Sequence, residues 1–132
     1  VGVVSSFNQL IDTYAEPELA GSTELRSFVL GQSPAGLPSD ATVINATSLG
    51  LGIADPSPID LRTLPRPRAV YDMVYRPPRT ALLRQAAELG LAHANGLSML
   101  IHQGARSLGL WTGATVPVPV MQAAAHAALN SV

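Results

Sequence analysis

The sequence contains neither cysteine nor lysine among its 132 residues. Without cysteine the chain cannot form disulfides, thiolate nucleophiles or thiolate metal sites. All 8 cationic residues are therefore arginines, and the formal net charge is only -1. Because proteins that bind nucleic acids present a dense basic surface to the phosphates, we expect no nucleic-acid partner.

Long apolar runs and a glycine-rich phosphate motif are also absent. Proline, glycine or polar residues interrupt each apolar stretch before it is long enough to cross a bilayer, so we expect a cytoplasmic protein without membrane contact. There is no Gly-x-Gly-x-x-Gly motif, since Gly50 and Gly52 stand in the wrong context for a phosphate-binding turn. His93, His102 and His126 lack ligand spacing, so we expect no metal site.

From residue 42 onward the sequence alternates between short β-branched runs and amphipathic segments. Apolar runs bounded by turn residues predict three strands, at 42–45, 69–74 and 91–95. Apolar residues at helical spacing predict three helices, at 80–90, 97–111 and 118–132. The Gly- and Pro-rich residues 46–67 predict a loop with one helical turn near Leu61. This order favours an α/β fold in which helices flank a parallel sheet.

Residues at the helix ends support these limits. Thr80 is a capping residue at the start of its helix, Gly90 stands where a C-terminal glycine belongs, and Pro119 lies in a first turn. Trp111 ends an amphipathic helix and is expected to pack. Asp72 is expected to be buried in or near its strand.

The first forty-one residues are the hardest to interpret. Among them "VGVV" is consistent with a buried strand, "TELRSFVL" has helical spacing, and "GQSPAGLPSD" has the composition of a turn. We therefore divide the chain into a poorly assignable segment, 1–41, and a domain, 42–132.

Parallel sheets bind ligands at the carboxyl ends of their strands, so the segments that follow the predicted strands attract attention. These segments are "NATS" at 45–48, "YRPP" at 75–78 and "NGLSML" at 95–100. Each has two interpretations. "NATS" either lines a ligand site or forms an ordinary turn in which Asn45 bonds local backbone. Tyr75 is either a hydroxyl donor to a ligand or a half-buried tyrosine whose hydroxyl group contacts solvent.

Residues of the third segment and of the helix that follows it also have two interpretations each. Gly96 either lets the backbone approach a flat ring or is a plain turn glycine. Gln103 either binds a polyhydroxylated ligand or is an exposed helix glutamine. Met73 is expected in the core or in a pocket wall.

Four stretches together resemble the C-terminal part of the shikimate dehydrogenase family: "VINATSLG", "SPIDL", "AVYDMVYRPPRTALLRQAAELG" and "NGLSMLIHQGARSLGLWTG". They follow one another in the family's order over roughly residues 40–125. The resemblance implies a Rossmann-like parallel sheet flanked by helices, incomplete relative to the family's two-domain architecture. No stretch of residues 1–41 carries the resemblance, and the first part of the nucleotide-binding domain is one interpretation of this segment.

The resemblance further implies roles for individual residues. Residues expected to line or border the cofactor are Asn45, Ala46, Thr47, Ser48, Met73 and Gly96. Tyr75 and Gln103 are expected to contact the substrate. Members of the family reduce 3-dehydroshikimate to shikimate with NADPH, or act on quinate, so the resemblance implies NADP, with NAD not excluded.

The family's proton-transfer residues are a lysine and an aspartate on an N-terminal substrate domain, and this chain has no lysine. Two interpretations follow. In the first, which we favour, the chain is part of an enzyme whose catalytic residues lie on a missing N-terminal domain or a partner chain. In the second it is a non-catalytic sensor or regulatory module that binds a nucleotide, shikimate or quinate. A homodimer stays open in either case.

Overall fold

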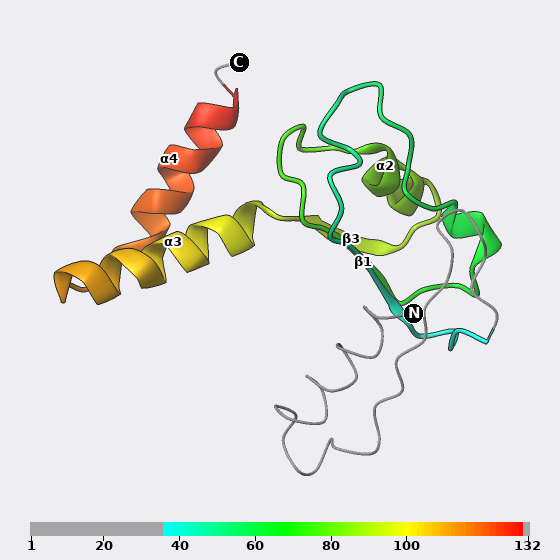
Figure 1. Ribbon diagram of the computed structural model, residues 1–132, viewed down its shortest axis with the longest axis horizontal. Coiled ribbons are helices and arrows are strands. Elements are labelled where there is room, and N and C mark those ends of the chain that lie inside the picture. Colours follow the sequence, from blue (N-terminus) through cyan, green and yellow to red (C-terminus); the bar gives the residue numbers. More distant parts are fainter. Residues whose placement is uncertain (1–35, 131–132) are drawn as a thin grey trace, which may run out of the picture. The chain divides into compact units, whose positions relative to one another are not determined.

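A computed structural model describes the backbone of residues 36–130 (Figure 1). Its sheet contains three parallel strands in the order β1-β2-β3: β1 Thr42–Asn45, β2 Ala69–Asp72 and β3 Ala92–Asn95. The predicted parallel α/β fold is confirmed. The proposed strands "VGVV" and helix "TELRSFVL" lie outside the described residues, and the division at residue 41 stays a prediction.

The second strand ends earlier than the sequence pattern predicts. The backbone N–H of Met73 still donates to the carbonyl of Asn45, at 3.0 Å. The next N–H, that of Val74, donates instead to the carboxylate of its neighbour Asp72, also at 3.0 Å. Because the Asp72 side chain occupies the Val74 N–H, that group cannot bond the backbone of a neighbouring strand, and β2 ends at Asp72.

The helices follow the sequence signals closely. They are the short 3-10 helix η1 Leu61–Thr63, followed by α2 Ala81–Glu88, α3 Leu97–Thr112 and α4 Val118–Asn130. Thr80 caps α2 by accepting from the Leu83 N–H at 3.3 Å, and Gly90 adopts a left-handed φ of 64° just beyond the helix. Pro119 lies in the first turn of α4. These predictions are confirmed.

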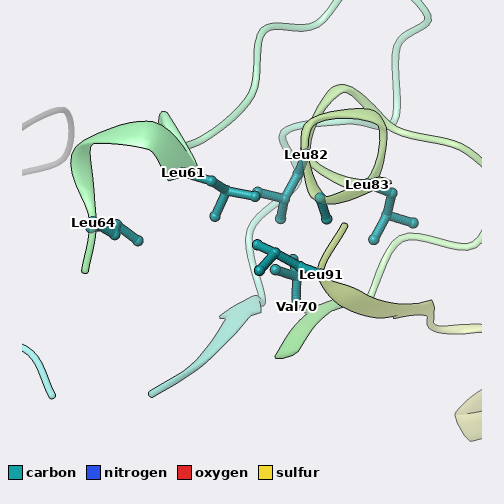
Figure 2. Close-up of a cluster of buried hydrophobic side chains, with 7 residues drawn as sticks. Leu61, Leu64, Val70, Leu82, Leu83 and Leu91 are labelled. Carbon is teal, nitrogen blue, oxygen red and sulfur yellow. The ribbon is translucent and has the colours of Figure 1, made fainter. Parts of the chain in front are cut away.

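The main core lies between one face of the sheet and the helices η1 and α2 (Figure 2). Its buried members are Leu61, Leu64, Val70, Leu82, Leu83, Ala86 and Leu91. Leu82 is completely buried, with 0% of its surface exposed. Each fully buried leucine stabilises the fold by about 1.5–3 kcal/mol relative to an exposed one. This cluster therefore fixes α2 on the sheet.

The opposite face of the sheet is apolar and open. Ile44, Tyr71 and Ala94 are register partners, so their side chains share one face. Ile44 is 61% exposed and Ala94 is exposed as well. Strands of parallel sheets are normally covered on both faces. Within the described residues, this sheet is covered on one.

The last two helices are in contact: α3 leaves the end of β3, and α4 starts against α3 and then slopes steeply away from it (Figure 1). The expectation that Trp111 packs is wrong, because its side chain is 82% exposed. Gly109 faces the returning chain at Ala114 and Val116. Two residues further on, Trp111 lies about 200° around the helix, on the far side. None of the helices described between residues 36 and 130 could span a membrane.

Candidate functional site

A buried hydrogen-bond network joins the carboxyl ends of β1 and β2 to the start of α2. At its centre is Asp72, with 0% exposure, as expected from the sequence. Its Oδ1 accepts from Asn45 Nδ2 at 2.9 Å and from the Val74 N–H at 3.0 Å. Its Oδ2 accepts from Thr80 Oγ1 at 2.5 Å. The network thus ties together three segments that are distant in sequence.

The Asn45 side chain organises the turn that follows β1. Its Oδ1 accepts from the Thr47 N–H at 3.0 Å and from Thr47 Oγ1 at 2.7 Å. Its Nδ2 donates to the Leu49 carbonyl at 3.0 Å as well as to Asp72. Asn45 is only 4% exposed, so its amide serves the turn, which was one of the two interpretations of "NATS". Ala46, Thr47 and Ser48 remain exposed.

A pocket of about 520 Å³ lies beyond the carboxyl ends of β1 and β2. It is lined by Ala46, Thr47, Leu51, Met73, Val74, Tyr75, Arg76, Ala128 and Leu129. Four of the eight residues predicted for the site therefore meet here. Met73 and Tyr75 are each 38% exposed, so both present surface to a ligand. The walls combine a small alanine, a hydroxyl, a thioether and a phenol.

Gly96 borders this region by its backbone. Its N–H donates to the Val74 carbonyl at 3.4 Å. A Cβ built on Gly96 would lie 2.0 Å from the Met73 carbonyl oxygen and 2.7 Å from its carbon. Its φ of -74° suits any residue, so the position requires glycine because of space. Gly96 thus allows close approach of backbone to backbone at the β3–α3 junction.

The structure does not place Gln103 in the same pocket. Gln103 is exposed on α3 and is absent from the residues that line it, as are Asn45 and Ser48. His102 is also exposed. Among the described residues no group of three or more His, Cys, Asp or Glu side chains could hold a metal ion.

Five residues that line the pocket were not predicted for the site: Leu51, Val74, Arg76, Ala128 and Leu129. Arg76 lies in the segment "YRPP" singled out above, but it was not among the residues predicted for the site, although its position next to Tyr75 was a usable signal. Leu51 comes from the loop after β1. Ala128 and Leu129 come from α4, and no local pattern connects them with β1 or β2. Contacts across such separations require the fold.

A larger cavity of about 740 Å³ lies between α2, β3, α3 and α4. Arg79, Arg84, His93 and His126 are among the residues that line it. It contains none of the eight predicted site residues and does not lie at the ends of β1 and β2. We therefore assign the candidate site to the smaller pocket, where the predicted residues meet.

The parallel sheet and the pocket beyond the carboxyl ends of its strands are the arrangement found in the class of open α/β domains, which bind ligands at this edge. The family model described as "Shikimate 5'-dehydrogenase C-terminal domain" matches residues 96–126. The chain belongs to the shikimate dehydrogenase family and corresponds to its C-terminal region.

The NADP(+)-dependent shikimate dehydrogenase of Methanocella arvoryzae is 46% identical over 87 residues, which are 66% of this chain and 32% of the relative. The Thermus thermophilus enzyme, solved with NADP(H) and shikimate, matches 70% of this chain and 38% of its own, with 37% identity and a TM-score of 0.61. A quinate dehydrogenase from Corynebacterium glutamicum, solved with NAD, matches 61% and 30%, with 34% identity and a TM-score of 0.55. The chain thus spans about a third of the length of these relatives.

Proposed function

We propose that this chain is the cofactor-binding part of a cytoplasmic, NADPH-dependent dehydrogenase that reduces 3-dehydroshikimate to shikimate. The observation that supports this most is the meeting of Ala46, Thr47, Met73 and Tyr75 in one pocket at the carboxyl ends of β1 and β2. Both NADP(H) and NAD occur in solved relatives, and NADP is our choice because curated relatives such as that of Methanocella arvoryzae are named for it.

The pocket residues fit the nicotinamide end of such a cofactor. Ala46 leaves room for a flat ring, and the Met73 thioether is a polarisable apolar surface for it. The Tyr75 hydroxyl can donate a hydrogen bond to a polar group of the substrate. When bound, the cofactor supplies the hydride. The chain's own residues then hold the two reactants in place and exclude water.

Other parts of the proposed enzyme have to come from elsewhere. The described residues offer no glycine-rich phosphate turn, and the whole chain offers no lysine for proton transfer. We therefore place the proton-transfer residues on an N-terminal substrate domain or a partner chain. The same absence of lysine favours the second candidate function, a non-catalytic module that binds a nucleotide, shikimate or quinate.

We expect the purified 132-residue chain to show no shikimate-dependent reduction of NADP. The reason is that no lysine is available to move the proton of the substrate hydroxyl. Absorbance of the reduced nicotinamide measures the reaction, and a two-domain relative assayed in parallel is the positive control. Turnover by the chain alone would contradict the division of roles between this chain and another domain.

We expect Gln103→Ala, made in the intact protein, to weaken binding of shikimate about fivefold, since a hydrogen bond to a neutral partner contributes about 1 kcal/mol. The melting temperature should not change, because Gln103 is exposed. Titration calorimetry with shikimate measures the affinity. The neighbouring exposed His102→Ala is the matched control, as its side chain points about 100° away around the helix. Equal affinity in both variants would remove Gln103 from the substrate site.

A further inference from the structure

Asp72 is a buried carboxylate whose bonded partners are all neutral. Among the described residues it accepts from Asn45, from the Val74 N–H and from Thr80, and no arginine pairs with it. A buried carboxylate is costly unless donors satisfy it. Here both oxygens are satisfied, because no buried side-chain polar atom of the described residues lacks a partner. Only a carboxylate of this size accepts on both oxygens, whereas an amide would turn an N–H₂ group toward a donor.

The two oxygens serve different parts of the fold. Through Asn45, Oδ1 reaches the turn that holds Thr47, and through the Val74 N–H it fixes the backbone between Met73 and Tyr75. Both of these segments are walls of the 520 Å³ pocket. The Oδ2 atom reaches Thr80, which caps α2 by accepting from the Leu83 N–H. Thr80 and Leu83 do not line that pocket.

We propose that Asp72 is a positioning residue for the ligand pocket, whose Oδ1 sets the spacing between the wall around Thr47 and the wall around Tyr75. Besides this network, the Met73 N–H donates to the Asn45 carbonyl at 3.0 Å, at the end of the ladder that joins β1 and β2. That bond pairs the strand ends, and the Gly96 N–H holds the Val74 carbonyl, but neither bond joins the wall around Thr47 to the wall around Tyr75. The carboxylate makes this connection without itself touching the ligand.

The test compares Asp72→Asn with Thr80→Ala in the intact protein. Asp72→Asn alters the hydrogen bonds of both carboxylate oxygens. Thr80→Ala removes only the hydrogen bond to Oδ2 and the side-chain cap of α2. We expect both variants to melt at lower temperature than the parent. Only Asp72→Asn should shift the amide NMR signals of Thr47 and Val74 and speed their hydrogen exchange. Only Asp72→Asn should also raise the Kd for NADPH, by about tenfold or more.

The measurement of the Kd for NADPH rests on the proposed function, whereas the measurements on the Thr47 and Val74 amides do not. If the parent protein fails to bind NADPH, the proposed function is wrong, and the Thr47 and Val74 amides still decide whether Asp72 positions the walls. Equal effects of both variants on these amides and on NADPH would show a general loss of stability and overturn the proposal. Unchanged amides in Asp72→Asn would overturn it too. Should Asp72→Asn not fold, Asn45→Ala removes the link from Asp72 to Thr47, together with the bond to the Leu49 carbonyl, and is expected to disturb the Thr47 amide while leaving Leu83 unchanged. An equal disturbance of Leu83 would overturn the proposal.

Discussion

Replacing Gly96 by alanine is expected to lower the free energy of unfolding by about 3 kcal/mol, or to prevent folding. The added Cβ would lie 2.0 Å from the Met73 carbonyl oxygen, where real Cβ atoms keep at least 3.0 Å. The β3–α3 junction or the end of β2 must therefore move by about 1 Å, in a close-packed region that resists such shifts. Because Met73 lines the pocket, we expect cofactor affinity to fall together with stability.

Gly104, inside the helix α3 that Gly96 precedes, provides a matched control for this substitution. A Cβ at Gly104 would meet only the Met121 Cε, at 3.6 Å, which is an ordinary contact. Gly104→Ala should therefore stabilise the protein by about 0.5–1 kcal/mol through higher helix propensity. Urea unfolding of the two variants measures the difference. A stable Gly96→Ala protein that behaves like Gly104→Ala would show that the backbone segments are not in close contact.

Truncating Leu82 in the main core is expected to cost about 2–5 kcal/mol. Leu82 is 0% exposed and lies between α2 and the sheet, so its loss leaves a cavity at the centre of the cluster (Figure 2). The exposed Leu110, at 75%, is the control, and Leu110→Ala should change stability by less than about 0.5 kcal/mol. Chemical denaturation compares the two variants, with the same dependence of the unfolding free energy on denaturant concentration used for both. Similar losses in both variants would mean that Leu82 is not at the centre of the core.

Much of the fold could be predicted because local signals and the global arrangement agree. Thr80 and Gly90 fixed the limits of α2, since a side-chain cap and a left-handed glycine are local requirements. The position of the pocket followed from a general rule about parallel sheets, which brought Thr47 and Tyr75 to one edge. Burial of Asp72 was also predictable, because it ends an apolar strand.

The rest depends on contacts that no sequence window contains. The contact of Gly96 with the Met73 backbone depends on the register between β2 and β3. The contribution of Ala128 to the pocket depends on the direction of α4. The exposure of Trp111 depends on where the chain turns after α3, since an amphipathic pattern shows that a face exists but not what covers it.

The open face of the sheet has a consequence for the behaviour of this polypeptide in solution. The apolar face that includes Ile44 adjoins β1, an edge strand of the described sheet whose outer backbone groups can accept another strand. Attraction between such surfaces is entropic and gains strength on warming toward room temperature. Wherever this face is left uncovered, the polypeptide should therefore self-associate with rising concentration, and sulfate should favour that association rather than suppress it. A segment or partner that covered this face would act as a solubiliser, and synthesis of the polypeptide without such a cover would burden chaperones.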